Sequence, residues 1–330
     1  MQDAAVPPVA VRSTLPVLPA AADFAARRVE SRRRLADLLS RSGAEPPALE
    51  VVLAEKYGFC AGVRVADKLV RLAAAKGKTG AILGQVVHNE SVEAEMARLG
   101  FPTVETLEEA RGHENRIVFS AHGVAPSVRR DASVRGLKAI DTTCKFVTDI
   151  HKEIDRSLSE GAFIAIMGQR DHREVVGYTK DLKPETYEIF YSLEEVKAYD
   201  WPRHPKVKII FQTTINADNF AEHVKEIQRR VGEARVADTI CYATKENQEA
   251  LRVLCNDGGI EAIVVIGGRH SKNTKELARI AEAYKPTYLI GTVGDLPVAK
   301  LAGLRKVGVT AGASTPDYDV EAVVEKLRGL

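Results

Sequence analysis

The sequence predicts an α/β protein made of three similar α/β domains around a pseudo-three-fold axis. Two observations predict this class. From residue 51 onward, short apolar runs alternate with helical patterns, which is typical of parallel sheets covered by helices. The same cysteine-led unit also occurs three times along the chain. A length of 330 residues suits two or three domains and is too long for one compact core.

The expected elements follow from apolar periodicity, taken in chain order. In the first unit we expect strands at 51–54, 81–83, 116–120 and 138–140, and helices at 62–75, 90–99 and 127–135. In the second unit we expect strands at 162–167 and 207–211, and helices at 145–160 and 219–231. In the third unit we expect strands at 262–266 and 306–309, and helices at 245–256 and 274–283. The predicted domains are 62–144, 145–237 and 238–311, with a strand at 51–61 completing the third and a C-terminal tail at 312–330 closing over the site.

Residues 1–50 are predicted to be an N-terminal extension. The first 22 residues are rich in Ala, Val and Pro, which is typical of a mobile arm. A helical pattern follows over 22–42. Acidic residues in this stretch argue against an organelle transit peptide, so we expect an appended helix that packs on the body or on a partner.

Composition excludes several classes of function. The formal net charge of +2 provides neither a basic field for nucleic acid nor an acidic tail. The longest apolar runs are far shorter than the ~20 residues that a membrane helix needs. Four cysteines in 330 residues do not make a disulfide framework. We therefore expect a cytoplasmic protein that binds neither nucleic acid nor membrane, with thiols that are buried, catalytic or metal-binding.

The repeated unit places a thiol before a buried strand and polar side chains after it. Cys144, which ends Asp141-Thr142-Thr143-Cys144, precedes Gly168 by 24 residues, His172 by 28 and Glu174 by 30. Cys60 and Cys241 open the other two copies. The corresponding residues are Gly84, His88 and Glu90 after Cys60, at the same three spacings, and Gly267, Ser271 and Asn273 after Cys241, where Gly267 lies at 26 residues.

A second polar set follows a later strand of each unit: His122, Thr213 with Thr214, and Ser314. Ligands of parallel α/β sheets bind outside the carboxyl ends of the strands. If the three units meet on a common axis, the three thiols converge at its centre. The remaining polar groups then surround a cavity beside the thiols.

Three converging thiols are candidate metal ligands. Soft thiolates suit zinc, copper(I) or iron–sulfur clusters. A structural zinc site usually takes four ligands in close sequence pairs, whereas gaps of 84 and 97 residues separate these cysteines. Three thiolates on a four-iron cluster would leave one iron open to a substrate. The fourth cysteine, Cys255, is flanked by apolar residues on a predicted helix and is interpreted as core.

The other polar groups suit an anion. Histidines and neutral hydroxyl or amide donors at strand ends, together with helix N-termini, favour a phosphate or diphosphate. Glu174 is the carboxyl that we expect to carry a proton, with Thr213 as the relay. Trp201 is interpreted as packing rather than as a contact for an electron donor.

At this level of detail the sequence resembles the 4-hydroxy-3-methylbut-2-enyl diphosphate reductase family, from about residue 51 to 330. The motifs that carry the resemblance are, in order, Gly58-Phe59-Cys60-Ala61-Gly62-Val63, Val87-His88-Asn89, Ser120-Ala121-His122-Gly123-Val124, Asp141-Thr142-Thr143-Cys144, His172-Arg173-Glu174-Val175, Gln212-Thr213-Thr214, Ile240-Cys241-Tyr242-Ala243-Thr244, Ser271-Lys272-Asn273-Thr274 and Gly312-Ala313-Ser314-Thr315-Pro316-Asp317. Each motif alone is weak, but nine in the same order are specific.

The resemblance implies a trefoil of three α/β domains around a central [4Fe-4S] cluster on Cys60, Cys144 and Cys241. It implies reductive dehydroxylation of an allylic diphosphate, the small-molecule substrate, to isopentenyl and dimethylallyl diphosphate. Ferredoxin or flavodoxin would supply two electrons. It also implies roles for individual residues. Proton delivery falls to Glu174 and Thr213, and diphosphate binding to His88, His122, His172, Ser271, Asn273 and Ser314; we add Thr214 and Lys272 as substrate-binding candidates.

The sequence departs from the family pattern at several positions. Lys272 stands where the family often has a second serine, and Arg173 and Lys145 stand where it often has proline. Lys272 either adds a charge to the diphosphate site or faces solvent. A non-catalytic iron–sulfur redox sensor on the same scaffold is the alternative function. The enzyme is favoured because a sensor needs neither Glu174 and Thr213 nor a diphosphate pocket.

Overall fold

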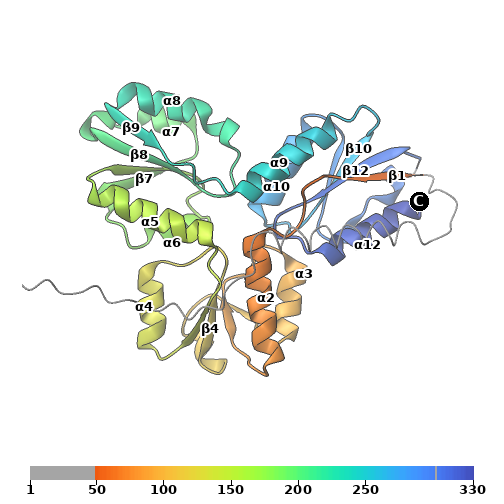
Figure 1. Ribbon diagram of the computed structural model, residues 1–330, viewed down its shortest axis with the longest axis horizontal. Helices are drawn as coiled ribbons and strands as arrows, with labels where there is room; N and C mark the ends of the chain where they lie inside the picture. The colour runs from red at the N-terminus through yellow and green to blue at the C-terminus, as the bar shows by residue number, and fades with distance from the viewer. Residues whose placement is uncertain (1–48, 302) are drawn as a thin grey trace, which may run out of the picture. The chain divides into compact units, whose positions relative to one another are not determined.

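The computed structural model describes residues 49–301 and 303–330 (Figure 1). The predicted mobile arm and helix of the N-terminal extension therefore lie outside the described residues. The described part contains three four-stranded sheets, and every strand pairing in them is parallel. This confirms the predicted α/β class with three similar sheets. Within the described part, no helix is both long and apolar enough to cross a bilayer.

The first sheet has the order β3-β2-β4-β5. Its strands are β2 (Ala81–Leu83), β3 (Thr103–Val104), β4 (Arg116–Phe119) and β5 (Lys138–Asp141), and its helices are α2 (Ala61–Ala75), α3 (Glu90–Arg98) and α4 (Pro126–Val134). The apolar stripe of α2 packs on one face of this sheet through Ala66 and Val70, which are fully buried.

The second sheet has the order β7-β6-β8-β9. Its strands are β6 (Phe163–Met167), β7 (Tyr187–Phe190), β8 (Lys206–Phe211) and β9 (Glu233–Val236), and its helices are α5 (Lys145–Ser159), α6 (Arg173–Thr179), α7 (Leu193–Ala198) and α8 (Ala221–Arg230). Alternate residues of β6 face opposite sides: Phe163, Ala165 and Met167 pack with α7 and α8, and Ile164 and Ile166 pack with α5 and α6 (Figure 1). Helices on both faces explain why this strand is apolar throughout.

The third sheet has the order β1-β12-β10-β11. Its strands are β1 (Glu50–Leu53), β10 (Ala262–Ile266), β11 (Thr287–Ile290) and β12 (Lys306–Ala311), and its helices are α9 (Tyr242–Cys255), α10 (Lys272–Glu282), α11 (Val298–Leu301) and α12 (Asp317–Arg328). The first strand of the described chain thus pairs with the last, with Val52 opposite Gly308. Residues 317–328, predicted as part of a tail, form a helix that packs against β1.

The structure adds elements that periodicity did not predict. The outer strands β3, β7, β9 and β11, the short helices α6, α7 and α11, and α12 are absent from the sequence prediction. Short 3-10 helices also occur at Glu109–Gly112, Pro184–Thr186, Trp201–Arg203, Ala217–Phe220 and Val293–Asp295. Two expectations about core residues are confirmed: Trp201 is fully buried and its indole N–H donates to the carbonyl of Val196 at 2.7 Å, and Cys255 is 2% exposed in the core of the third domain.

Candidate active site

One pocket collects side chains from all three domains. It contains every site residue predicted from the sequence. These are Cys60, His88, His122, Cys144, His172, Glu174, Thr213, Thr214, Cys241, Ser271, Lys272, Asn273 and Ser314. The structure thus brings these side chains together where equivalent strand ends of the three sheets meet, and their roles stay predictions.

Each of the three cysteines is the N-cap residue of a helix: Cys60 precedes α2, Cys144 precedes α5 and Cys241 precedes α9. The Sγ of Cys60 accepts a hydrogen bond from the backbone N–H of Val63 at 3.5 Å. A helix N-terminus carries partial positive charge, which favours thiolates. Helix α9 begins three residues earlier than predicted, directly after its cysteine.

The first turn of α2 touches the second thiol. A Cβ added to Gly62 would lie 2.6 Å from the Sγ of Cys144 and 4.0 Å from that of Cys60. Only glycine allows this approach, since real Cβ atoms do not come so close to sulfur. The backbone thus brings the thiols of the first and second units to the same wall of the pocket.

The three thiols are partly buried and not oxidised to disulfides. Burial, reinforced by the neighbouring Cys60, raises the pKa of Cys144 to about 11 and that of Cys241 to about 12. No three histidine, cysteine or acidic side chains among the described residues are grouped around the position of a single metal ion. A cluster differs from a single ion because each of its irons takes its own thiolate. Three thiols at the starts of three different helices suit a cluster rather than a single ion.

Three histidine rings form a compact group beside the thiols. The ring centroid of His88 lies 4.3 Å from that of His122 and 5.8 Å from that of His172. Burial lowers the pKa of His88 to about 4 and that of His172 to about 3, and it lowers the pKa of His122 well below its usual value. All three rings are therefore neutral at pH 7.

Hydrogen bonds distinguish the roles of two of these rings. The Nδ1 of His172 accepts from the backbone N–H of Glu174 at 3.3 Å, so its Nε2 carries the hydrogen of the neutral ring. The Nδ1 of His88 lies 2.8 Å from the Oε1 of Gln85, which accepts, so the Nε2 of His88 lacks a hydrogen until the ring is protonated. An anion in the pocket would favour that protonation.

The third domain supplies neutral donors at the start of α10. Ser271 is its N-cap residue, and its Oγ accepts from the backbone N–H of Thr274 at 3.3 Å. The Oγ of Ser314 donates to the carbonyl of His88 at 3.1 Å. The amide group of Asn273 is buried and both of its polar atoms lack a hydrogen-bond partner. A buried amide without partners is costly, which suits a ligand that would satisfy it.

Lys272 lines this pocket, and its charge lowers the pKa of both His88 and His172. This effect on the histidines favours the first of the two alternatives from the sequence, which stays a prediction. Arg173, which also departs from the family pattern, forms an ion pair with Glu105 at 2.9 Å and also lowers the pKa of His88.

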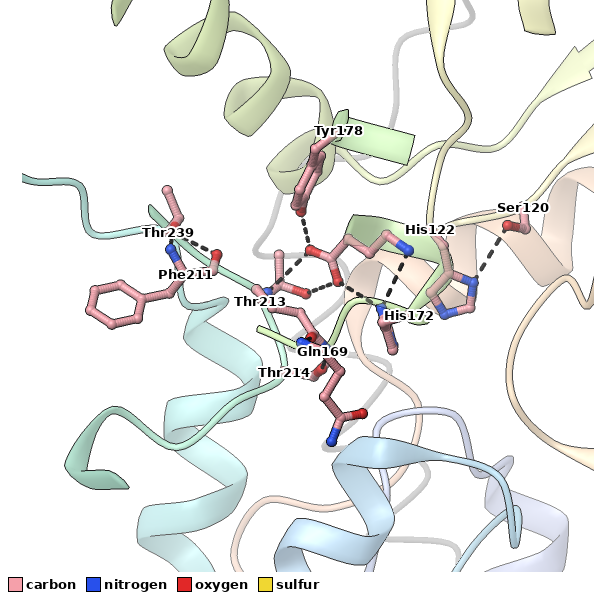
Figure 2. A network of polar contacts seen from close by, with 11 residues as sticks. Ser120, His122, Gln169, His172, Tyr178, Phe211, Thr213, Thr214 and Thr239 are labelled. Carbon is pink, nitrogen blue, oxygen red and sulfur yellow. Dashed lines mark hydrogen bonds and ion pairs between the residues drawn. The ribbon is translucent and has the colours of Figure 1, made fainter. Parts of the chain in front are cut away.

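Glu174 is the buried acid of the site, with 1% of its surface exposed. Its Oε1 accepts from the backbone N–H of Thr213 at 3.1 Å, and its Oε2 accepts from the Oγ1 of Thr213 at 2.9 Å (Figure 2). Burial raises the pKa of this carboxyl, although the hydrogen bonds oppose the shift. A buried carboxyl with a raised pKa is suited to hold and release a proton.

Sequence reasoning missed one partner of this acid and one buried residue beside the relay. Tyr178 donates its hydroxyl hydrogen to the Oε1 of Glu174 (Figure 2). Its position four residues after Glu174 on α6 is the signal that could have found it, but α6 itself was not predicted. Gln212, directly before Thr213, is 1% exposed and its amide donates to the Oγ1 of Thr214 at 2.9 Å.

Comparisons with known proteins agree with this site. The LytB protein family model matches residues 51–328. The 4-hydroxy-3-methylbut-2-enyl diphosphate reductase of Clostridioides difficile (strain 630) is 33% identical over 283 residues, covering 86% of this chain and 100% of that protein. The reductase of Aquifex aeolicus (strain VF5) is 33% identical over 287 residues, covering 86% of this chain and 97% of that protein.

Solved structures show the same likeness. The E-1-hydroxy-2-methyl-but-2-enyl-4-diphosphate reductase from Plasmodium falciparum has a TM-score of 0.78 at 27% identity, covering 85% of this chain and 88% of that one. A second structure, of (E)-4-hydroxy-3-methyl-but-2-enyl diphosphate reductase, has a TM-score of 0.63 at 31% identity, covering 86% of this chain and 100% of that one. These matches confirm the resemblance indicated by the motifs and the assignment as an oxidoreductase, and the chain belongs to the LytB protein family.

Proposed function

We propose that this chain reduces (E)-4-hydroxy-3-methylbut-2-enyl diphosphate to isopentenyl and dimethylallyl diphosphate. The reaction consumes two electrons and two protons, breaks the C–O bond of the alcohol, and releases water. One observation carries the proposal: three partly buried thiols, a buried carboxyl and a group of anion donors line a single pocket. The names of the relatives support the same substrate and the same reaction.

The thiols of Cys60, Cys144 and Cys241 are proposed to hold a [4Fe-4S] cluster. The residues fit such a group, because each thiol begins a helix and therefore lies in partial positive charge. Binding would displace the thiol protons that burial otherwise retains. When bound, such a cluster supplies electrons and one open coordination position.

The diphosphate is proposed to bind the histidine group and the start of α10. The Nε2–H of His172, the hydroxyls of Thr214, Ser271 and Ser314, and the amide of Asn273 are donors in one pocket. His88 becomes a donor at Nε2 on taking up a proton, so we expect diphosphate binding to be coupled to proton uptake, and His122 lines the same side of the pocket. Lys272 adds a positive charge to this side of the pocket.

Proton delivery is proposed to run from Glu174 through the hydroxyl of Thr213. The two groups are hydrogen-bonded at 2.9 Å, and both line the pocket. The apolar wall that includes Val63, Val87 and Phe146 excludes water, which keeps the proton from bulk solvent. Water release from an alcohol needs a proton at the leaving oxygen, and this pair is placed to provide it.

The electrons are proposed to come from ferredoxin or flavodoxin in the cytoplasm. The chain is expected to act without nucleic acid or membrane as a partner. A redox sensor has no use for a buried acid and relay beside its thiols, so Glu174 and Thr213 favour the enzyme over that alternative.

The test is anaerobic reconstitution followed by turnover with an artificial electron donor. The wild-type protein should bind about four irons and convert the hydroxylated C5 diphosphate to the two products, measured by mass spectrometry. Cys144→Ser should lose the full iron content and the activity. Cys255→Ser, a buried thiol outside the pocket, is the matched control and should keep both. A fully loaded wild-type protein that leaves this diphosphate unchanged would contradict the proposal.

A further inference from the structure

The carboxyl of Glu174 accepts three hydrogen bonds, two at Oε1 and one at Oε2. Its Oε1 accepts from the backbone N–H of Thr213 and from the hydroxyl of Tyr178. Among the residues that the structure describes, its Oε2 accepts only from the Oγ1 of Thr213, while the Nδ1 of His172 lies 3.9 Å away. Figure 2 shows Tyr178 and Thr213 approaching the carboxyl from different sides.

Tyr178 is held firmly in place. It lies one helical turn after Glu174 on α6, is 3% exposed, and packs in the core between α5, α6 and the second sheet. Its ring meets that of His151 in a T-shaped contact with centroids 5.2 Å apart. Glu174 and Thr213 line the pocket, whereas Tyr178 does not. The phenol therefore reaches Glu174 from the interior of the domain, with its own rotamer fixed by packing.

This division of donors determines where a transferable proton resides. A backbone N–H has only a hydrogen to give, so Oε1 already faces one such hydrogen and a second from the phenol. A carboxyl proton on Oε1 would compete with both. On Oε2 it would face the Oγ1 of Thr213, a hydroxyl that accepts as well as donates.

We propose that Tyr178 is a positioning residue that, by occupying the Oε1 of Glu174, directs the transferable proton to Oε2, the oxygen that faces Thr213. The inference rests on the proposed role of Glu174 as the acid. In the transfer, the O–H bond at Oε2 breaks and a new O–H bond forms at the Oγ1 of Thr213. The original hydroxyl hydrogen of Thr213 passes to the substrate oxygen. Glu174 is left as a carboxylate that the hydroxyl of Tyr178 and the backbone N–H of Thr213 stabilise.

The polar and titratable groups around Glu174 and Tyr178 come from α5 and its N-cap, from α6 and from the loop after β8. Cys144 and His151 come from α5, His172 and Tyr178 from the start and body of α6, and Thr213 from the loop after β8. Arg129, Asp155 and Asp181 act on His151 from farther out. Among the groups named here, only Thr213 and Tyr178 donate side-chain hydrogen bonds to the carboxyl of Glu174.

Tyr178→Phe tests the proposal because it keeps the ring contact with His151 and removes only the hydroxyl. We expect kcat to fall about tenfold, a part of what a positioned acid contributes, while KM and iron content stay at the wild-type values. The solvent deuterium isotope effect on kcat should increase, because proton transfer becomes slower. Tyr284→Phe, at an exposed tyrosine of the third domain, is the control and should change none of these.

A second variant and a second measurement decide between positioning and packing. In the Glu174→Gln background, Tyr178→Phe should cause no further loss, because Tyr178 acts only through that carboxyl. Infrared spectra of the metal-free protein should show the protonated carboxyl band of Glu174 at higher frequency in Tyr178→Phe. An active wild type with an unchanged kcat and band in Tyr178→Phe would overturn this inference alone. An inactive, fully loaded wild type would instead overturn the proposed function.

Discussion

Glu90 and Glu174 occupy the same place in the repeat, 30 residues after Cys60 and Cys144, and yet have opposite surroundings. Glu90 is exposed, and its Oε1 accepts from the backbone N–H of Arg269 in the third domain at 3.1 Å. Glu174 is 1% exposed and bonded to Thr213 and Tyr178. The two glutamates show that equal spacing in the repeat does not decide whether a side chain lines the pocket, since Glu174 lines it and Glu90 does not.

The start of the following helix accounts for the difference. Helix α3 begins at Glu90 itself, after the N-cap Asn89, whereas α6 begins one residue before Glu174, after the N-cap His172. One residue turns a side chain by about 100° around the helix axis. Glu174 is therefore turned inward as the second residue of its helix. Asn273, also the second residue of its helix, is likewise buried in the pocket.

The largest expected effect comes from removing each glutamate in turn. Glu174→Gln should lower kcat by about 10² to 10⁴, the usual contribution of a positioned acid or base, with unchanged iron content. Glu90→Gln should stay within about twofold of wild type, since its side chain is exposed and does not line the pocket. Steady-state turnover of the loaded enzymes measures both. Equal losses of kcat in the two variants would show that the two glutamates do not differ in function.

The histidines sharpen the comparison because both units bury theirs. A histidine whose pKa is lowered on folding stabilises the protein above its unfolded pKa of about 6.5 and loses that contribution as the pH falls toward the folded value. For His88 the folded pKa is about 4, so this loss should be on the order of 3 kcal/mol between pH 6.5 and 4.

Urea unfolding of the metal-free protein at several pH values measures this loss. His88→Gln and His172→Gln should each flatten the pH dependence of the free energy of unfolding. His113→Gln, at a residue outside the pocket, serves as the control and should leave the curve of the wild type unchanged. A curve that stays equally steep in His88→Gln would show that its ring is not the neutral, buried group described here.

A smaller effect is expected from the neighbouring threonines. Thr213→Val keeps the shape and removes the hydroxyl that links Glu174 to the pocket, so kcat should fall about tenfold. Thr214→Val should instead raise KM, because Thr214 bonds to Gln212 rather than to the acid. Separate measurements of kcat and KM distinguish the two. A rise in KM alone for Thr213→Val would remove it from the proton route.

The smallest expected effect concerns the third unit. Lys272→Ser restores the residue that the family often has and removes one positive charge from the diphosphate side of the pocket. We expect KM to rise about threefold at low salt, as a partly exposed charge contributes modestly. The difference should shrink as ionic strength increases. An unchanged KM at low salt would place the ammonium group outside the binding site.

The sequence was sufficient for the parts of the molecule that are periodic. Apolar runs such as Ile263–Ile266 predicted the buried strands, and the three cysteine-led units predicted which side chains share the pocket. The sequence was insufficient where the exact first residue of a helix decides whether a side chain is buried. Spacing alone treated Glu90 and Glu174 as equals, and the unpredicted helix α6 hid Tyr178. The short outer strands such as β3 have too few residues for a periodic pattern.

The central claim is that burial gives Glu174 the character of a proton-holding acid. Infrared titration of the protonated carboxyl band tests it most directly, in the wild type, Glu174→Gln and Glu90→Gln. The wild type and Glu90→Gln should share a component of this band that persists above the ordinary glutamate pKa of about 4.3, and Glu174→Gln should lack that component. No difference between the wild type and Glu174→Gln, or a lost component that titrates at the ordinary value, would contradict the account.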